Sequence, residues 1–579
     1  MDRDNMPPEI TPTGNTPAID AAVVKEKLRQ KANKRLASLD ALRGLNMLCI
    51  IGLASLIAAI CNLHAENFRV FGDAAVEKVA AFREHWKGPS PDFIKNQMDH
   101  VTWNGLRHHD TIFPLFLFLA GVSFPFSFAK QRANGRPVWR VCLKIVCRGL
   151  ALFVVGYFYQ NKVRFDFPNT RFMGVLQHIG LAWMIAAFLY LCLAKRIKTQ
   201  VAVCAAILVA YWLGVALIPA RDVCGDEAFT ADAFKHRAAQ LFVVRAFEKL
   251  PDLPPQDENN AEASDENVAN ITDAQSLAEN ENGAVTENVA DSENEEPTAK
   301  KHSFKGLVAG LFEEDPLPNF DDPNYPEPGT VDHNLLPEGC VVNYFDRQYV
   351  PCKLYHDRDN VRKAIADGEI ENTYNPSLWR NMRDPEGLAC TFPAIVTALL
   401  GMLFGGVLRK DDLLCPKMKK VGILVGYGVI LLVVGFLWHL IFPINKNLWN
   451  SSFVCFVGGY SALALACSYL LIDVLPLRWL GWPFAVIGMN SIAIFVIRRI
   501  VDFTNARNFF FADAIERFVP NSYPDPNFVP DPSVADPGAV EIPMIECGAF
   551  QNIATIVAGL IVAWLFLFWL YKKKIFIKL

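Results

Sequence analysis

Apolar runs of roughly 18 to 25 residues, separated by polar segments, recur along most of the chain. Each run is long enough to cross a hydrocarbon layer of about 30 Å as an α-helix. The runs predict spans near residues 41–61, 111–129, 143–159, 174–194, 201–219, 388–408, 421–441, 453–472, 482–497 and 553–571. The pattern therefore predicts an all-α polytopic membrane protein with about ten transmembrane helices.

Basic residues collect at one end of successive spans and indicate the orientation of the chain. If the N-terminus and the C-terminus are both cytoplasmic, the larger basic clusters all face the cytoplasm. These clusters lie at residues 25–35, 130–148, 195–198, 409–420 and 572–574. Only Arg498 and Arg499 fall on the outer side. Short loops tolerate such exceptions, and an anionic ligand is the alternative explanation for this pair.

The spans and their loops divide the chain into four segments. We expect a basic cytoplasmic N-terminal segment, helices 1–5 with an outer segment around His100, a large outer insertion, and helices 6–10. Their limits are residues 1–35, 36–220, 221–388 and 389–579.

The outer insertion has two compositions. Residues 251–300 are rich in Glu, Asp, Asn and Ala, and they cannot bury enough apolar area to offset ordering, so we expect disorder there. Residues 304–387 contain Pro, Tyr and Trp and could fold as a small cap over the outer face. This part also holds Cys340 and Cys352, which could pair if the loop faces an oxidising compartment.

Composition supports the membrane class. Hydrophobic residues make up 52% of the chain, and the 56 basic and 60 acidic residues nearly balance at a net charge of −4. No nucleic-acid signature accompanies this balance. The first 35 residues lack the charged-then-apolar pattern of a cleavable signal peptide, so we expect the first span to serve as the insertion signal.

The strongest candidate for chemistry is the segment Met98 to Phe124, in which polar residues crowd one end of a span. His100 and Asp110 lie there beside other ionisable and aromatic side chains. An imidazole at the membrane boundary can take or give a proton near neutral pH. The alternative is that these are ordinary interfacial side chains, which are common at helix ends.

Carboxamides, cations and Trp residues precede several of the inward-running spans. Such groups can form a sugar pocket, because hydroxyls need bidentate partners and the CH face of the ring needs an aromatic platform. Plain interfacial anchoring explains the same pattern. The candidate substrate-binding residues are Trp103, Asn104, Trp379, Glu386, Asn445, Lys446 and Asn447.

One segment resembles the signature of a known family. It reads His100-x-x-Trp103-Asn104-Gly105-Leu106-x-x-x-Asp110-x-x-Phe113-Pro114-x-Phe116-x-Phe118-x-x-Gly121, and it is similar to the heparan-α-glucosaminide N-acetyltransferase family of membrane acetyltransferases. Further blocks agree in the same order: RLASLDALRGLNML, RFMGVLQHIGLAW, RDPEGL, FPINKNLWNSSFV and GMNSI. The resemblance covers about residues 35–220 and 375–500.

The resemblance implies a function. Members of that family transfer acetyl from cytosolic acetyl-CoA, without a metal, to the amine of a terminal glucosamine on the far side of the membrane. The active histidine of the family matches His100. Two departures leave the acceptor open: the acidic insertion at residues 221–374, and the lack of the outer N-terminal region of the animal enzyme.

The expected mechanism gives roles to the candidate residues. His100 would be the general base, oriented by Asp110 or Asp99, and Asn104 would bind the oxyanion or the acceptor. A covalent acetyl-imidazole on His100 is the competing route. By position alone, we expect the residues that hold acetyl-CoA and line its passage to include Arg43, Lys144, Arg148 and Asn490.

Other functions stay open at this level. A transporter or flippase for a glycan or lipid-linked sugar would fit the same spans, and so would a sensor that uses the outer insertion. Partners other than acetyl-CoA and an amino-sugar or glycan acceptor are expected to be membrane lipid and, as an option, a second copy of the chain. We expect the bacterial inner membrane, with the acceptor site facing outward.

Overall fold

The computed structural model describes most of the chain. The described residues are 36–71, 73–161, 170–193, 196–243, 311–312, 317–323, 325–351, 354–355, 379–475, 477–500, 503–519, 522–524, 544–546 and 548–577. Statements about structure below refer to these residues. The acidic tract at 251–300, the basic segment at 1–35 and Cys352 lie outside them, whereas Cys340 is a buried, free cysteine.

Within the described ranges, nine helices are long and apolar enough to cross a membrane, and a bent pair makes ten if it counts as one span. The protein is therefore a polytopic helical membrane protein, and the predicted fold class is confirmed. The spans are α2–η1–α3 (Ala37–Cys61, with a π-helical turn η1 at Cys49–Leu53), α6 (His108–Ala133), α7 (Val138–Asn161), α8 (Val175–Cys192), α9 (Ile197–Leu217), α17 (Thr391–Arg409), α18 (Lys417–His439), α19–η7 (Ser451–Val474) and α23 (Gly548–Lys572).

The predicted ninth span is broken. Two helices, α20 (Arg478–Gly488) and α21 (Ser491–Ile500), meet at a bend of 46°. Asn490, at this break, donates a side-chain hydrogen bond to the carbonyl oxygen of Ile575 and accepts one from the backbone N–H of Ile577, at 3.0 Å each. The break thus fastens the C-terminal segment to the bundle.

Several segments expected to be loops contain short helices. Local capping explains some of them: Ser90 accepts from the N–H of Phe93 at the start of α5, and Thr330 accepts from the N–H of His333 at the start of α13. The shorter elements are η2 (Ala65–Phe71), α4 (Asp73–His85), α5 (Pro91–Asn96), α10 (Arg221–Cys224), η4 (Glu227–Phe229), α11 (Ala231–Gln240), α13 (Val331–Asn334), α14 (Val341–Tyr349), α22 (Phe503–Phe518) and the paired strands β1 (Ser522–Pro524) and β2 (Met544–Glu546).

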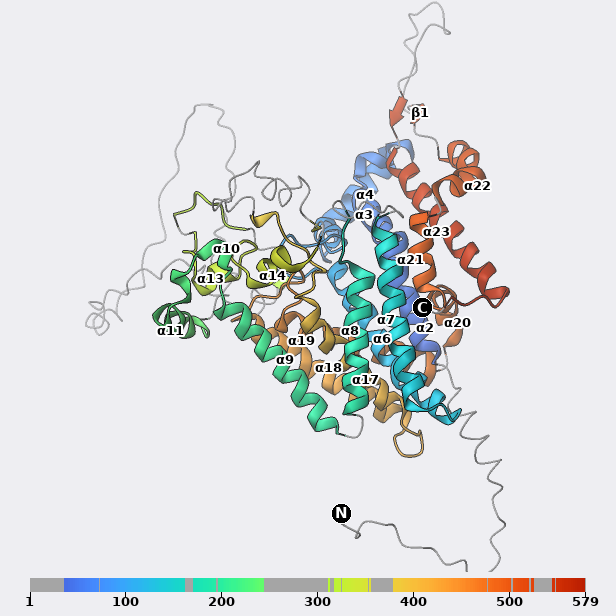
Figure 1. Ribbon diagram of the computed structural model, residues 1–579. Helices are drawn as coiled ribbons and strands as arrows, with labels where there is room; N and C mark the ends of the chain where they lie inside the picture. The colour runs from blue at the N-terminus through green and yellow to red at the C-terminus, as the bar shows by residue number, and fades with distance from the viewer. Residues whose placement is uncertain are drawn as a thin grey trace, which may run out of the picture.

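The pair α6 and α17 forms the centre of the bundle (Figure 1). Gly121 of α6 faces the carbonyl oxygen of Ala398, and Gly401 of α17 faces that of Phe118, so closely that neither position has room for a Cβ. Small residues let helices approach in this way where lipid offers no hydrophobic drive for association. Helix α8 packs against α17 and α7, while α2 packs against α20.

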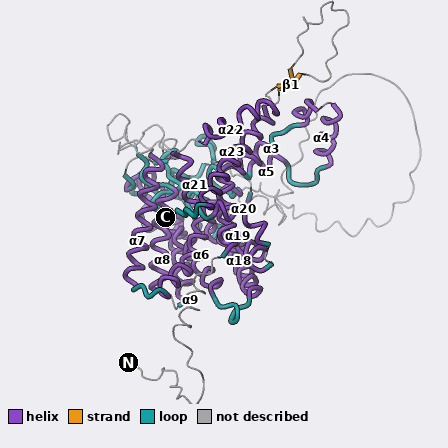
Figure 2. The backbone as a smooth tube through the Cα atoms, turned by 90° about the vertical axis from the view of Figure 1, so that its right-hand side faces the viewer, coloured by secondary structure: helices purple, strands orange, loops and turns teal. Residues whose placement is uncertain are grey.

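Two groups of short elements lie at one end of the bundle. Figures 1 and 2 show α3, α4 and α22 together at one side of this end, and Figure 1 shows α10, α13 and α14 at the other. The segment before α6 is tied to the second group, because Trp103 Nε1 donates to the carbonyl oxygen of Leu335 at 2.8 Å. The polar residues that the sequence singles out before α6 therefore lie at this end of the bundle, which we call the capped end. The name cap is used below for α10, α13 and α14 together with residues 379–382, which contact them.

Candidate active site

Asp110 lies in the first turn of α6 and has no solvent exposure. Its carboxylate accepts weak hydrogen bonds from the backbone N–H groups of Arg107, at 3.3 Å, and Val101, at 3.4 Å. A carboxylate at a helix N-terminus is also stabilised by the helix dipole. These contacts fix the direction of its free oxygen, Oδ1.

His100 meets that oxygen. Its Nδ1 lies 2.6 Å from Asp110 Oδ1, and its side chain is 51% exposed. The ring also lies edge-on to His109, with the ring centroids 4.6 Å apart. Asp99, the other expected orienting residue, instead accepts from the backbone N–H of His100 at 2.8 Å. The structure therefore brings together His100 and Asp110, with one edge of the imidazole open.

Lys446 completes a three-residue cluster. Its Nζ lies 3.2 Å from Asp110 Oδ1 and 3.0 Å from His100 Nδ1, and its side chain is 13% exposed. Lys446 belongs to the segment between α18 and α19, far from α6 in the sequence. The ammonium compensates the buried charge of Asp110, since an unpaired buried carboxylate is costly.

The protonation pattern follows from the distances. Both Lys446 and the ring can donate to Asp110, whereas Lys446 and a protonated Nδ1 cannot donate to each other. Because the 2.6 Å contact is the shortest of the three, we assign the ring proton to Nδ1, with Asp110 as its acceptor. The lone pair of the neutral imidazole is then on Nε2.

Three carboxamides join the two segments of this site. Asn445 Nδ2 donates to Asn104 Oδ1, and Asn447 Nδ2 donates to the carbonyl oxygen of Thr102, both at 3.0 Å. Asn445 Oδ1 accepts from the N–H of Leu448. Within the described part of the chain, no hydrogen bond is made by the amide nitrogen of Asn104, so its N–H groups are free for a ligand.

Trp103 contributes differently from the expectation of a sugar platform. Its ring is fully buried, its Nε1 is bonded to the cap, and the Arg383 guanidinium lies 5.4 Å from the ring centroid. Burial lowers the pKa of Arg383 to about 10. Trp103 therefore holds the His100 segment against the cap.

A buried ion network lies next to this cluster. Arg171, before α8, donates from Nε to Asp384 Oδ2 at 2.9 Å and from Nη2 to Glu386. Burial alone would raise the pKa of Glu386, but the charges of Arg171 and Lys446 outweigh it and the pKa is lowered. Glu386 is therefore an anion, and the nearby positive charge of Lys446 helps to lower its pKa.

A second cationic position lies deeper in the bundle. Arg43 of α2 donates to the carbonyl oxygen of Leu119 at 3.0 Å and to the hydroxyl of Ser123, and it lies 3.7 Å from Asp40. The guanidinium of Arg148 stacks 4.5 Å from the ring centroid of Trp183.

The Nε–H group of Arg148 is a hydrogen-bond donor without an acceptor in the described part of the chain, and the Nε atom is buried. The charged group that acts on Arg148 is Arg43, of the same sign. Lys144, one helical turn earlier on α7, is exposed. Two cations close to each other, one of which has an unused donor, are suited to an anionic ligand.

Comparison with known proteins shows what the sequence around this site is similar to. Residues 74–223 match the family model described as heparan-α-glucosaminide N-acetyltransferase, catalytic, and this range includes His100, Asp110 and Arg171. The chain is similar to heparan-α-glucosaminide N-acetyltransferases. The resemblance predicted from the sequence motifs is thereby confirmed.

Two curated heparan-α-glucosaminide N-acetyltransferases show the extent of the likeness. The protein from Homo sapiens is 24% identical over 413 residues, which cover 69% of this chain and 48% of that protein. The protein from Mus musculus is 27% identical over 424 residues, which cover 70% of this chain and 49% of that protein. The chain spans about half the length of the curated relatives it matches.

Two predicted site residues lie in neither the His100 cluster nor the deeper cationic position. Trp379 packs with Ala220, Val223 and Met382 in the cap, and Asn490 binds the C-terminal segment. Among the described residues, no group of three or more His, Cys, Asp or Glu could hold a metal ion. Sequence reasoning missed the ion pair of Arg171 with Asp384, although both occur in motifs that carried the resemblance.

Proposed function

We propose that the chain is a membrane acetyltransferase that moves an acetyl group from cytosolic acetyl-CoA to the amine of a terminal glucosamine or a similar amino sugar on the outer side. The observation that carries the proposal is the 2.6 Å contact between His100 and buried Asp110, within the range that matches the catalytic family model. The names of the relatives support the acetyl transfer and the class of acceptor.

The first step is activation of the acceptor amine. An ammonium ion has no lone pair with which to attack a thioester, so a base must remove a proton. Neutral His100 has its lone pair on Nε2, because Asp110 holds the proton on Nδ1. General-base assistance of this kind contributes about 10²- to 10⁴-fold to the rate.

The second step is attack on the thioester. The amine nitrogen must lie about 3 to 3.5 Å from the carbonyl carbon. Donors must then stabilise the negative oxygen of the tetrahedral intermediate. Asn104 and Lys446 provide N–H groups beside the ring and are the proposed donors. As the carbon–nitrogen bond forms, the nitrogen releases its second proton to water. When the carbon–sulfur bond breaks, the CoA thiolate takes the first proton from the His100 imidazolium, which regenerates the neutral base.

The acceptor sugar would bind between the segments that flank the imidazole. Asn447 and Glu386 provide carboxamide and carboxylate groups for hydroxyls, and Asn445 orients Asn104. Trp103, which is buried and hydrogen-bonded to Leu335, would hold the His100 segment of this pocket in position. The two residues outside the cluster, Trp379 and Asn490, would affect the pocket only through the cap and the C-terminal segment.

The coenzyme would place its phosphates at the deeper cationic position. Arg43 lies near enough to Arg148 to act on its charge, and the unused Nε of Arg148 can donate to a phosphate oxygen. Lys144 lies exposed near the cytoplasmic end of α7 in the proposed orientation and would attract the coenzyme. In that orientation both chain ends are cytoplasmic and His100 faces the outside of the bacterial inner membrane.

The test is acetyl transfer by the full chain purified in detergent. With labelled acetyl-CoA and glucosamine, the wild type should form N-acetylglucosamine and release CoA. His100→Ala should lower the rate by at least about 10²-fold. His85→Ala, which removes an exposed histidine of α4, is the matched control and should keep the wild-type rate. Wild-type activity in the His100 variant would refute the proposal.

A further inference from the structure

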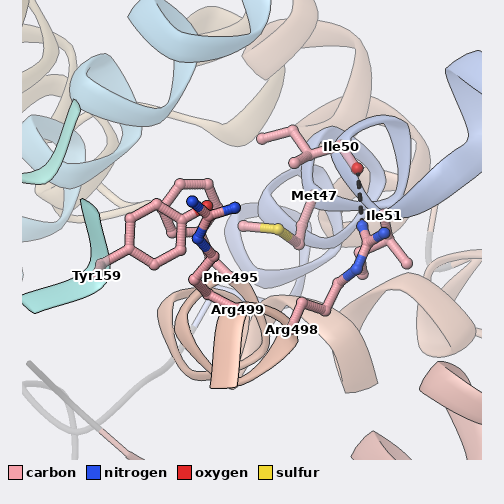
Figure 3. Close-up of a pocket in the computed structure, with 7 residues that line it drawn as sticks. All are labelled: Met47, Ile50, Ile51, Tyr159, Phe495, Arg498 and Arg499. Carbon is pink, nitrogen blue, oxygen red and sulfur yellow. Dashed lines mark hydrogen bonds between the residues drawn. The ribbon is translucent and has the colours of Figure 1, made fainter. Parts of the chain in front are cut away.

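A cavity of about 260 Å³ opens between α2–η1, α7 and α21. Figure 3 shows its lining, in which two arginines meet an otherwise largely apolar wall. The lining residues are Met47, Ile50, Ile51, Tyr159, Phe495, Arg498 and Arg499. None of them takes part in the chemistry proposed above.

The two arginines have no acidic partner among the described residues. Arg498 Nη1 donates to the carbonyl oxygen of Ile50 at 3.0 Å, and the Arg499 guanidinium lies 6.0 Å from the ring centroid of Tyr159. A carbonyl and an aromatic face stabilise a guanidinium but do not neutralise it. Two adjacent positive charges therefore border the same cavity, and no acidic side chain of the described ranges pairs with them.

The cavity lies at the same side of the bundle as His100. Helices α6 and α7 are joined by residues 134–137 only, so the C-terminal end of α7, where Tyr159 lies, is beside the N-terminal end of α6. Asn46 Nδ2 donates to the carbonyl oxygen of Ile112 in the first turns of α6, which places the neighbouring Met47 at the same depth. Helix α6 begins and α7 ends near this depth, although the first span continues to Cys61, and we place the boundary with the lipid headgroups here.

The lining matches the two parts of a phospholipid at that depth. Guanidinium groups bind phosphate oxygens in a bidentate manner, and Arg498 and Arg499 supply two of them. Met47, Ile50 and Ile51 form an apolar wall for the first carbons of an acyl chain. The volume accepts a phosphodiester with its glycerol but not a whole phospholipid, so the chains would extend into the bilayer.

We propose that this cavity binds the headgroup phosphate of an anionic phospholipid from the leaflet on the His100 side. The bound phosphate supplies a counter-charge for Arg498 and Arg499. It also bridges α2, α7 and α21, of which α7 and α21 are already joined by the stacking of Tyr159 on Phe495, with the ring centroids 4.7 Å apart. The site is separate from the His100 cluster, and its test does not depend on acetyl transfer.

Lipid binding to the purified full chain tests the site. Fluorescent phosphatidylglycerol should bind more tightly than fluorescent phosphatidylcholine. The double variant Arg498→Gln with Arg499→Gln should weaken phosphatidylglycerol binding roughly 30-fold, as expected for two cations at a membrane surface. Replacing both residues by Lys should restore most of the binding. Arg507→Gln, on exposed α22, is the matched control and should bind like the wild type.

A second variant tests whether the lipid needs the space inside the cavity as well as the two positive charges. Met47→Trp fills the apolar side while both arginines remain, and it should also weaken phosphatidylglycerol binding. Unchanged binding in the Gln double variant or in Met47→Trp would overturn the proposal. Displacement of the lipid by millimolar inorganic phosphate would likewise overturn it, because the site would then take a free anion. The elution volume on size exclusion checks that each variant is folded.

Discussion

The side-chain amide of Asn46 donates a 2.8 Å hydrogen bond to the carbonyl oxygen of Ile112, and this bond links the two halves of the proposed reaction path. Asn46 lies one turn from Arg43 on α2, and Ile112 lies two residues after Asp110 on α6. Along α6, the contacts of Arg43 at Leu119 and Ser123 lie roughly 14 to 20 Å from Asp110, at about 1.5 Å per residue. An extended thioester arm could cover that distance between phosphates and base.

Asp110→Asn tests the tautomer of His100. A carboxylate strongly favours the tautomer of His100 that carries its proton on Nδ1, whereas an Asn side chain does not. In a large fraction of the variant molecules the proton should therefore be on Nε2, which then has no lone pair for the amine proton. We expect kcat to fall by about 10²- to 10⁴-fold with little change in the KM for acetyl-CoA. Asp99→Asn, which alters only a backbone contact of His100, is the control and should stay close to the wild-type rate.

Lys446→Met tests the counter-ion of Asp110. Removing the ammonium leaves the buried carboxylate without its cation, and we expect a loss of about 3 kcal/mol in unfolding free energy. Denaturation of the purified protein measures it. The double variant Asp110→Asn with Lys446→Met should recover much of this stability, because neither charge remains. If the two losses simply add, Lys446 does not stabilise Asp110.

The fold class could be predicted because each membrane-spanning helix corresponds to a long apolar run in the sequence. The break at Asn490 could not, since the residues around it read as one continuous apolar segment and the bend depends on contacts with Ile575 and Ile577. The short helices at the capped end were missed for a related reason. Their N-cap residues, such as Ser90 and Thr330, stabilise these helices by a local hydrogen bond, and no long apolar run is needed.

The centre of the site could be predicted only in part. His100 and Asp110 are ten residues apart, and the motif that contains them gave both. Lys446 was expected to bind substrate, but its contact with Asp110 joins residues more than 300 positions apart. Neither the hydrophobic periodicity of the sequence nor the spacing of residues within a motif indicates such a contact. Trp103 was expected to face a sugar, because sequence cannot tell a pocket Trp from one that anchors a segment.

Arg148→Gln tests the proposed coenzyme position. Loss of one guanidinium should raise the KM for acetyl-CoA by about 10-fold, the cost of a charge-assisted hydrogen bond to phosphate, while kcat changes little. The KM for the amino sugar should not move. Arg140→Gln is the control, since Arg140 lies on the same helix but contacts Trp139 at the surface. Equal effects of the two variants would contradict a specific site.

Asp346 predicts a pH dependence of stability. Burial, and then the charge of Asp384, raise the pKa of Asp346 in the cap from 3.8 to about 8. Between these values the folded chain binds a proton that the unfolded chain has released, so stability falls as pH rises from about 4 to about 8. Asp346→Asn should therefore raise the melting temperature at pH 9 and leave it nearly unchanged at pH 4. Asp232→Asn, at an exposed position, should change neither.

Two-substrate kinetics distinguish direct transfer from an acetyl-imidazole intermediate. In direct transfer, acetyl-CoA and the amino sugar occupy the site together, so double-reciprocal plots should intersect. The N–H groups of Asn104 and the ammonium of Lys446, which lie beside the ring, would stabilise the oxyanion in either route. A covalent intermediate would instead give parallel lines. It would also give CoA release from acetyl-CoA in the absence of sugar, in a burst equal to the amount of enzyme, and His100→Ala would abolish that burst.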